Sequence, residues 1–130
     1  MGMKVIEINR TKSTPSVLLD TELGIFKVEG RSTPENSIDF YYPLRDKLIN
    51  GMKSKTLEVS INLEYFNTSS SKCLYDIFRS IKRLAMSGTE IYINWLYHPE
   101  DEDMLEVGED YSDLLNLPFS FVEYYPNLSA

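Results

Sequence analysis

Cysteine and histidine are scarce in this 130-residue chain, which contains one of each, Cys73 and His98. One thiol cannot build a disulfide framework, and one thiol with one imidazole does not supply a typical zinc ligand set. The HExxH, CxxC and GxSxG patterns of metal sites, redox sites and hydrolases are also absent. We therefore expect no disulfide, no metal and no cofactor, and a reducing cytoplasmic location.

The chain also has few cations, no long apolar run and no glycine-rich loop. Its 13 Lys and Arg residues are outnumbered by 20 Asp and Glu residues, and the net charge of −7 opposes binding to nucleic acid or to an anionic membrane surface. No segment approaches the roughly 20 apolar residues of a membrane-spanning helix. The six glycines are scattered singly, so an ATP-binding loop is not expected. Any kinase that acts on this chain would be a separate protein.

What the chain does contain is an alternation of strand and helix patterns. Its length and 42% hydrophobic content suit a single domain, residues 1–130, with one core. Strands are expected at Lys4–Ile8, Ser16–Leu19, Gly24–Glu29, Thr56–Phe66, Glu90–Tyr97 and Phe119–Tyr125. Helices are expected from Ser37 or Asp39 to just before Gly51, from Thr68 to about Ser87, and from the acidic run Glu100–Asp103 to Leu115. The order β-β-β-α-β-α-β-α-β predicts an α/β domain with a mixed sheet.

The segment Leu63–Lys72 joins a strongly apolar strand pattern to the most regular amphipathic helix pattern. Asn67 is suited to cap that helix, and four hydroxyl residues, Thr68 to Ser71, follow it. The start of a helix offers unpaired N–H groups and a dipole that favours negative charge, so a hydroxyl there is a suitable place for a phosphate. Capping alone explains part of the pattern, but four hydroxyls exceed what a cap needs and lower helix propensity.

The predicted topology brings three loops together. If the strands before the helices run parallel, their carboxyl ends meet at one edge of the sheet, where ligands and partners of open α/β sheets dock. That edge would gather Pro34–Ser37, Asn67–Ser71 and His98–Asp103. The partner-binding residues that we expect there are Glu35, Asn36, Asn67, Ser69 and Ser70.

Three segments resemble the SiaC-type bacterial regulatory phosphoproteins, which act in pathways that control biofilm formation and cyclic-di-GMP. These are Ser13-Thr14-Pro15, Pro34-Glu35-Asn36-Ser37 and Tyr65-Phe66-Asn67-Thr68-Ser69-Ser70. The resemblance implies a fold similar to the sulfate-transporter and anti-sigma-factor-antagonist (STAS) domain. It also implies that a serine/threonine kinase phosphorylates Thr68, that a phosphatase removes the phosphate, and that the unmodified protein binds and activates a diguanylate cyclase.

The sequence thus predicts a non-enzymatic binding switch that phosphorylation at Thr68 releases. Ser69, Ser70 and Ser71 remain alternative acceptors, because Ser71 extends the hydroxyl cluster. An antagonist-type switch acting on a different kinase would use a hydroxyl at the same helix start, so it stays open as a second hypothesis. A small enzyme or metal protein built on His98 and the nearby carboxylates is a third, although a solvated helix start explains the acidic run.

Overall fold

The computed structural model describes residues 5–126, in which strands and helices follow the expected order. The strands are β1 (Val5–Ile8), β2 (Ser16–Asp20), β3 (Ile25–Ser32), β4 (Thr56–Phe66), β5 (Glu90–Tyr97) and β6 (Phe119–Glu123). The helices are α1 (Ser37–Gly51), α2 (Thr68–Met86) and α3 (Glu102–Leu115). Lys4, where the first strand was expected to begin, lies outside the described residues. None of the helices in residues 5–126 is long and apolar enough to cross a membrane.

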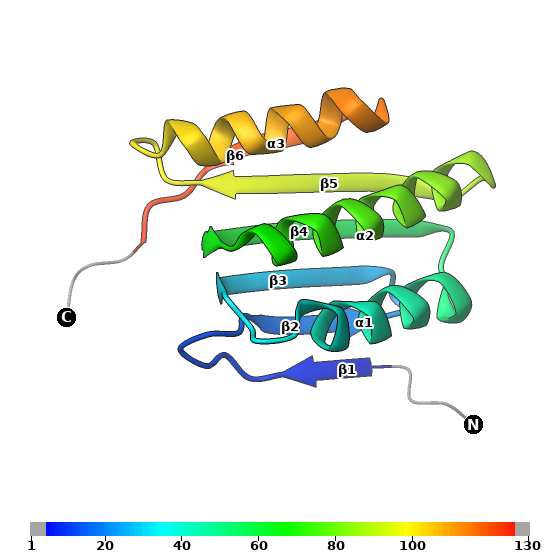
Figure 1. Ribbon diagram of the computed structural model, residues 1–130. Helices are drawn as coiled ribbons and strands as arrows, with labels where there is room; N and C mark the ends of the chain where they lie inside the picture. The colour runs from blue at the N-terminus through cyan, green and yellow to red at the C-terminus, as the bar shows by residue number, and fades with distance from the viewer. Residues whose placement is uncertain (1–4, 127–130) are drawn as a thin grey trace.

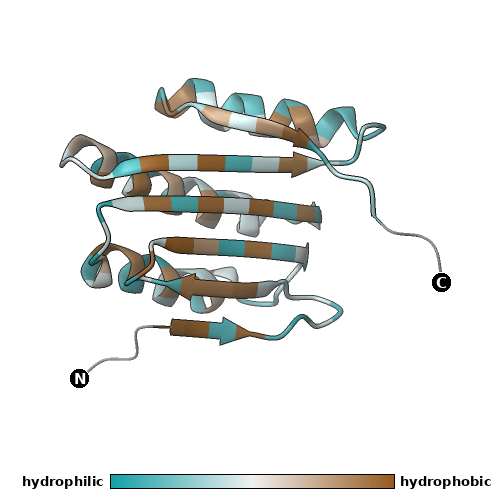
Figure 2. Cartoon of the chain, turned by 180° about the vertical axis from the view of Figure 1, so that it is seen from behind, coloured by the Kyte–Doolittle hydropathy of each residue, from teal (hydrophilic) through white to brown (hydrophobic). Residues whose placement is uncertain are grey.

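All six strands form one mixed sheet in which spatial order follows chain order. The first three strands pair antiparallel, whereas β3, β4, β5 and β6 run parallel to one another. Each helix crosses over between neighbouring parallel strands, and because such crossovers are right-handed and the order never reverses, the helices share one face of the sheet. Figure 1 shows the three helices on that face, and the view from behind in Figure 2 shows the opposite face uncovered.

The core lies between the helices and the covered face of the sheet. Alternate residues of β4 are buried there, at Leu57, Val59, Ile61 and Leu63. They share one hydrophobic cluster with the apolar stripe of α2, formed by Cys73, Leu74, Ile77, Phe78 and Ile81. Each fully buried large apolar side chain contributes roughly 1.5–3 kcal/mol relative to exposure. The packing of this face therefore holds α2, and with it the start of the helix, in a fixed position on the sheet. Cys73, the single cysteine, is buried on this apolar face of the helix.

Several boundaries differ from those expected. Helix α1 begins at Ser37, continues through Pro43 and includes Gly51, where the sequence indicated an earlier stop. Strand β3 extends to Ser32, and β6 ends at Glu123, before Tyr125. These shifts lie within the usual uncertainty of helix and strand ends.

Tyr65 follows Leu63 by two positions in β4, and strict alternation would place both side chains on the buried face, but Tyr65 is exposed. The pairing of β3 with β4 shifts register between Gly30 and Arg31, so that Arg31 pairs with Tyr65. A shift of this kind interrupts the alternation of faces along a strand. Tyr65 is therefore 48% exposed, and the Arg31 guanidinium lies 4.8 Å from its ring centroid.

Candidate functional site

The carboxyl ends of β3 and β4 bring two helix starts together, as the topology predicted. The Asn67 N–H donates to the Ser32 carbonyl at 3.0 Å, which joins the ends of the two strands. Across the adjacent helix starts, Ser37 Oγ of α1 and Ser69 Oγ of α2 share a hydrogen bond of 2.7 Å. The segments Pro34–Ser37 and Asn67–Ser71 are thus in direct contact.

Asn67 is the N-cap of α2. Its side-chain Oδ1 accepts the Ser70 N–H at 2.9 Å and the Ser69 hydroxyl at 3.2 Å, while its carbonyl accepts the Ser71 N–H at 3.0 Å. A short amide side chain in extended backbone is well suited to accept the Ser70 N–H, which the helix itself leaves without an acceptor. Asn67 therefore fixes the geometry of the whole first turn.

Ser70 points into the protein instead of toward a partner. It is 0% exposed, its hydroxyl donates to the Ser32 carbonyl at 3.2 Å, and its Oγ lies 2.9 Å from Ser32 Oγ and 3.3 Å from Ser37 Oγ. Tyr41 of α1 extends this network by a short hydrogen bond to Ser32. Because the third residue of α2 faces the core, the burial of Ser70 does not support the expectation that it contacts a partner.

Burial also determines the charge state of this network. Desolvation raises the pKa of Tyr41 to about 12, although the hydrogen bond from Ser32 opposes the shift. The phenol consequently stays neutral at physiological pH, keeps its proton and acts as a hydrogen-bonding partner. This arrangement braces the edge of the sheet.

Ser71 is half-buried and connects α2 to α3. Its Oγ lies 2.8 Å from the Tyr111 hydroxyl, and that hydroxyl donates to the Ser71 carbonyl at 2.9 Å. Burial raises the pKa of Tyr111, so this phenol is neutral as well. Sequence patterns gave no indication of Tyr111 here, because it lies 40 positions along the chain from Ser71.

Thr68 differs from the three serines that follow it. Its side chain is exposed, and within residues 5–126 its hydroxyl forms no hydrogen bond. Ser69 is exposed too, but its hydroxyl is held between Asn67 and Ser37. Thr68 consequently presents the one unengaged hydroxyl of this turn, at the positive end of the α2 dipole.

Glu35 and Asn36 lie on the α1 side of this edge, and both are exposed. Asn36 caps α1 by accepting the Asp39 N–H at 3.1 Å. Asn36 directly precedes Ser37, whose hydroxyl contacts Ser69, so the two predicted residues are neighbours of the α2 start in space. Because Glu35 and Asn36 are both exposed, this part of the edge is accessible from outside the molecule.

The loop after β5 contributes to a different hollow. His98 is exposed, its Nδ1 accepts the Glu100 N–H at 3.1 Å, and Asp101 then caps α3 by accepting the Met104 N–H. Within residues 5–126, no three His, Cys, Asp or Glu side chains gather in a way that could hold a metal ion. A cavity of about 270 Å³ includes His98 and Asp101 together with Arg10, Glu64, Tyr97 and Tyr124. Arg10 and Glu64 are joined there by a 2.7 Å ion pair.

Comparisons with known proteins agree on one family. Residues 8–124 match the model of a protein family that is described as the SiaC family regulatory phosphoprotein. SiaC of Pseudomonas aeruginosa has the same fold, with a TM-score of 0.83 at 26% identity, covering 94% of this chain and 100% of that one. The crystal structure of the diguanylate cyclase SiaD in complex with its activator SiaC, from the same organism, matches with a TM-score of 0.82 at 27% identity, covering 92% of this chain and 99% of the matched chain. An uncharacterised Pseudomonas aeruginosa protein is 28% identical over 120 residues, 91% of this chain and 95% of its own length.

Proposed function

The chain belongs to the SiaC family of regulatory phosphoproteins, and from that premise we propose that it is a phosphorylation-controlled binding switch with Thr68 as its phosphoacceptor. The observation that carries the proposal is the difference between Thr68 and its neighbours. A kinase needs a hydroxyl that can enter its active site, and Thr68 offers an exposed one that forms no hydrogen bond in residues 5–126. Phosphorylation of Ser70 would instead require the first turn of α2 to open, because that side chain is fully buried.

A phosphate on Thr68 would change the surface without melting the helix. It adds about 1.5 to 2 negative charges next to the free N–H groups of the first turn, where the helix dipole favours them. Lys72 follows four residues later on the same side of α2, a spacing at which an ion pair with the phosphate can form. A partner that buries the neutral Thr68 would instead meet an unpaired dianion, at a cost of several kcal/mol.

We propose a diguanylate cyclase as the partner, because a structural relative of this chain is the activator SiaC in complex with the cyclase SiaD. The unmodified chain would bind and activate the cyclase through the edge formed by Glu35, Asn36, Asn67, Thr68 and Ser69. A serine/threonine kinase would add the phosphate and release the cyclase, and a phosphatase would restore binding. The chain itself would catalyse no reaction, use no cofactor and act in the cytoplasm.

The test combines intact-mass analysis with cyclase binding. After incubation with ATP and the kinase of the same organism, the wild type and Ser69→Ala should each gain one phosphate, whereas Thr68→Ala should gain none. Thr68→Ala should still bind the cyclase, and Thr68→Asp should bind it more weakly. Equal labelling of Thr68→Ala and wild type would remove Thr68 from the assignment. Capture of a kinase of the anti-sigma-factor type, without a cyclase, would favour the antagonist-type switch.

A further inference from the structure

The exposed side of α2 carries a row of cations that begins at the predicted phosphorylation site. Lys72, Arg79 and Arg83 follow Thr68 by 4, 11 and 15 positions, which places all four residues on one side of a 3.6-residue helix. Thr68, Lys72, Arg79 and Arg83 are exposed. We call this row the α2 ridge, and its length from Thr68 to Arg83 is roughly 22 Å at 1.5 Å per residue.

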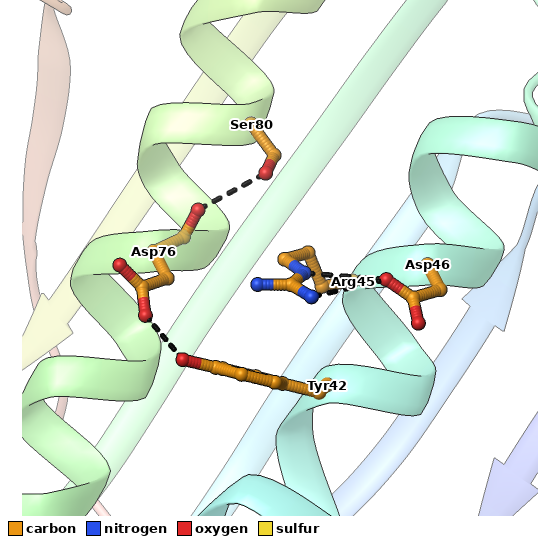
Figure 3. A network of polar contacts seen from close by, with 5 residues as sticks. All are labelled: Tyr42, Arg45, Asp46, Asp76 and Ser80. Carbon is orange, nitrogen blue, oxygen red and sulfur yellow. Dashed lines mark hydrogen bonds and ion pairs between the residues drawn. The ribbon is translucent and has the colours of Figure 1, made fainter.

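Part of the ridge borders a hollow between α1 and α2. The hollow has a volume of about 90 Å³ and is lined by Arg45, Asp76, Arg79, Ser80 and Arg83. Its one carboxylate, on Asp76, already accepts the Tyr42 hydroxyl at 2.7 Å. Figure 3 shows this contact, with Tyr42 reaching from α1 toward Asp76 on α2. Three guanidinium groups therefore border a space that contains little compensating charge.

The arginines of this hollow have few partners within the chain. Arg45 lies 3.9 Å from the Tyr42 ring centroid and makes a 3.3 Å contact with the exposed carboxylate of Asp46. Within residues 5–126, neither Arg79 nor Arg83 forms an ion pair. Arg79 has a single ring contact, 5.9 Å from the centroid of Tyr75. Their donors are thus available to a group from outside the molecule.

This concentration of positive charge lies on a chain whose net charge is −7. The overall negative charge repels long polyanions such as nucleic acid, which need an extended positive surface. A local basic patch of this size is suited instead to a few carboxylates of a protein partner, which arginine forks bind with two parallel hydrogen bonds. The volume of the hollow, about 90 Å³, is comparable to one such carboxylate group.

We propose that the α2 ridge, together with Arg45, is the docking surface for an acidic segment of the effector. The proposal rests on the proposed function and adds the reason why phosphorylation causes release. The four cations Lys72, Arg45, Arg79 and Arg83 exceed the carboxylates Asp46 and Asp76 by about two charges, and a phosphate of about −1.5 to −2 at Thr68 would cancel that excess. The phosphate repels the acidic segment at one end of the ridge and occupies Lys72.

Charge reversal tests the proposal by measuring the dissociation constant for the purified diguanylate cyclase of the same organism. The double variant Arg79→Glu/Arg83→Glu should bind about ten- to a hundredfold more weakly than the wild type. The control Lys27→Glu/Lys53→Glu alters net charge equally at exposed positions away from the ridge and should bind within about twofold of the wild type. Raising NaCl from about 50 to about 300 mM should weaken the wild type more than the ridge variant.

The outcomes separate this proposal from the switch itself. If phosphorylation releases the cyclase from the wild type but the ridge variant binds as tightly as the wild type, the ridge is not the docking surface and the switch still stands. Equal weakening of the ridge and control variants would also overturn the proposal, since it would reflect net charge alone. If the unmodified wild type does not bind the cyclase, both proposals fail. Thermal melting and Thr68 labelling should be unchanged in the ridge variant, which excludes misfolding as the cause.

Discussion

Replacement of Ser70 by alanine removes the hydroxyl that faces the interior at the start of α2. The side chain is 0% exposed, so water cannot substitute for its hydrogen bonds. The change deletes the bond donated to the Ser32 carbonyl at 3.2 Å and the contacts of Ser70 Oγ with Ser32 Oγ at 2.9 Å and Ser37 Oγ at 3.3 Å. The N-cap bond from the Ser70 N–H to Asn67 survives, because it involves only the backbone of the replaced residue.

The loss of stability in Ser70→Ala depends on which hydrogen bonds Ser32 and Ser37 keep. The Ser32 carbonyl still accepts the Asn67 N–H, and Ser32 Oγ still bonds to Tyr41. Ser37 Oγ keeps its bond to Ser69. With no partner left unpaired, the loss amounts to about two net hydrogen bonds of roughly 0.5–1.5 kcal/mol each. Alanine recovers about 0.5 kcal/mol of helix propensity, so we expect the free energy of unfolding to fall by about 1–2 kcal/mol and Tm by about 3–8 °C.

Urea unfolding provides the assay, because the chain has a single tryptophan, Trp95, and it is fully buried. Its fluorescence reports on the core without labelling. The matched control is Thr68→Ala, which changes an exposed hydroxyl and should alter stability by less than about 0.5 kcal/mol. Ser70→Ala should still accept one phosphate from the kinase. If Ser70→Ala is as stable as the wild type, or if Thr68→Ala is destabilised equally, the division of the cluster into a buried and an accessible hydroxyl is wrong.

Two further predictions concern the core around this site. Gly108→Ala would place a Cβ 2.6 Å from Cδ1 and Nε1 of the buried Trp95 ring. We therefore expect the free energy of unfolding, measured in urea, to fall by about 1–3 kcal/mol despite the better helix propensity of alanine. The exposed neighbour Glu109→Ala is the control and should leave stability unchanged. Stability should also fall as pH rises from about 10 toward about 12, because the unfolded phenol of Tyr41 ionises near 10 while burial keeps its folded pKa at about 12. The loss approaches 1.4 kcal/mol per pH unit in that window and is absent below it, and a Tyr41→Phe variant with the same pH dependence would contradict this.

Sequence patterns predicted the order of strands and helices because period-2 and period-3.6 repeats report directly on which residues face the core. They also placed Pro34–Ser37 beside Asn67–Ser71, since parallel strands end at one edge of a sheet. The exposure of Tyr65 could not be predicted, because it depends on a register shift between Gly30 and Arg31. Pairing irregularities arise between strands and leave little trace in either strand alone.

The α2 ridge was not predicted for a similar reason. Arg79 and Arg83 read along the sequence as the polar side of an amphipathic helix, which is their usual role. Their significance depends on Arg45, which belongs to another helix and joins them only once α1 and α2 pack together. Charge patterns that span two elements become visible when the fold is known.

The four consecutive hydroxyls of α2 take different roles because each residue of a helix is rotated by about 100° from the one before. Ser69 contacts α1, Ser70 faces the end of β3, and Ser71 reaches α3, so these three side chains hold the first turn against three other elements. Thr68 is left pointing outward from a turn that its neighbours keep rigid. A phosphate there would add charge to a fixed surface and leave the fold unchanged, so its effect would depend on which partner surface meets it. Under the proposed switch, control by phosphorylation would then be a property of the docking surface, whose charge the α2 ridge determines.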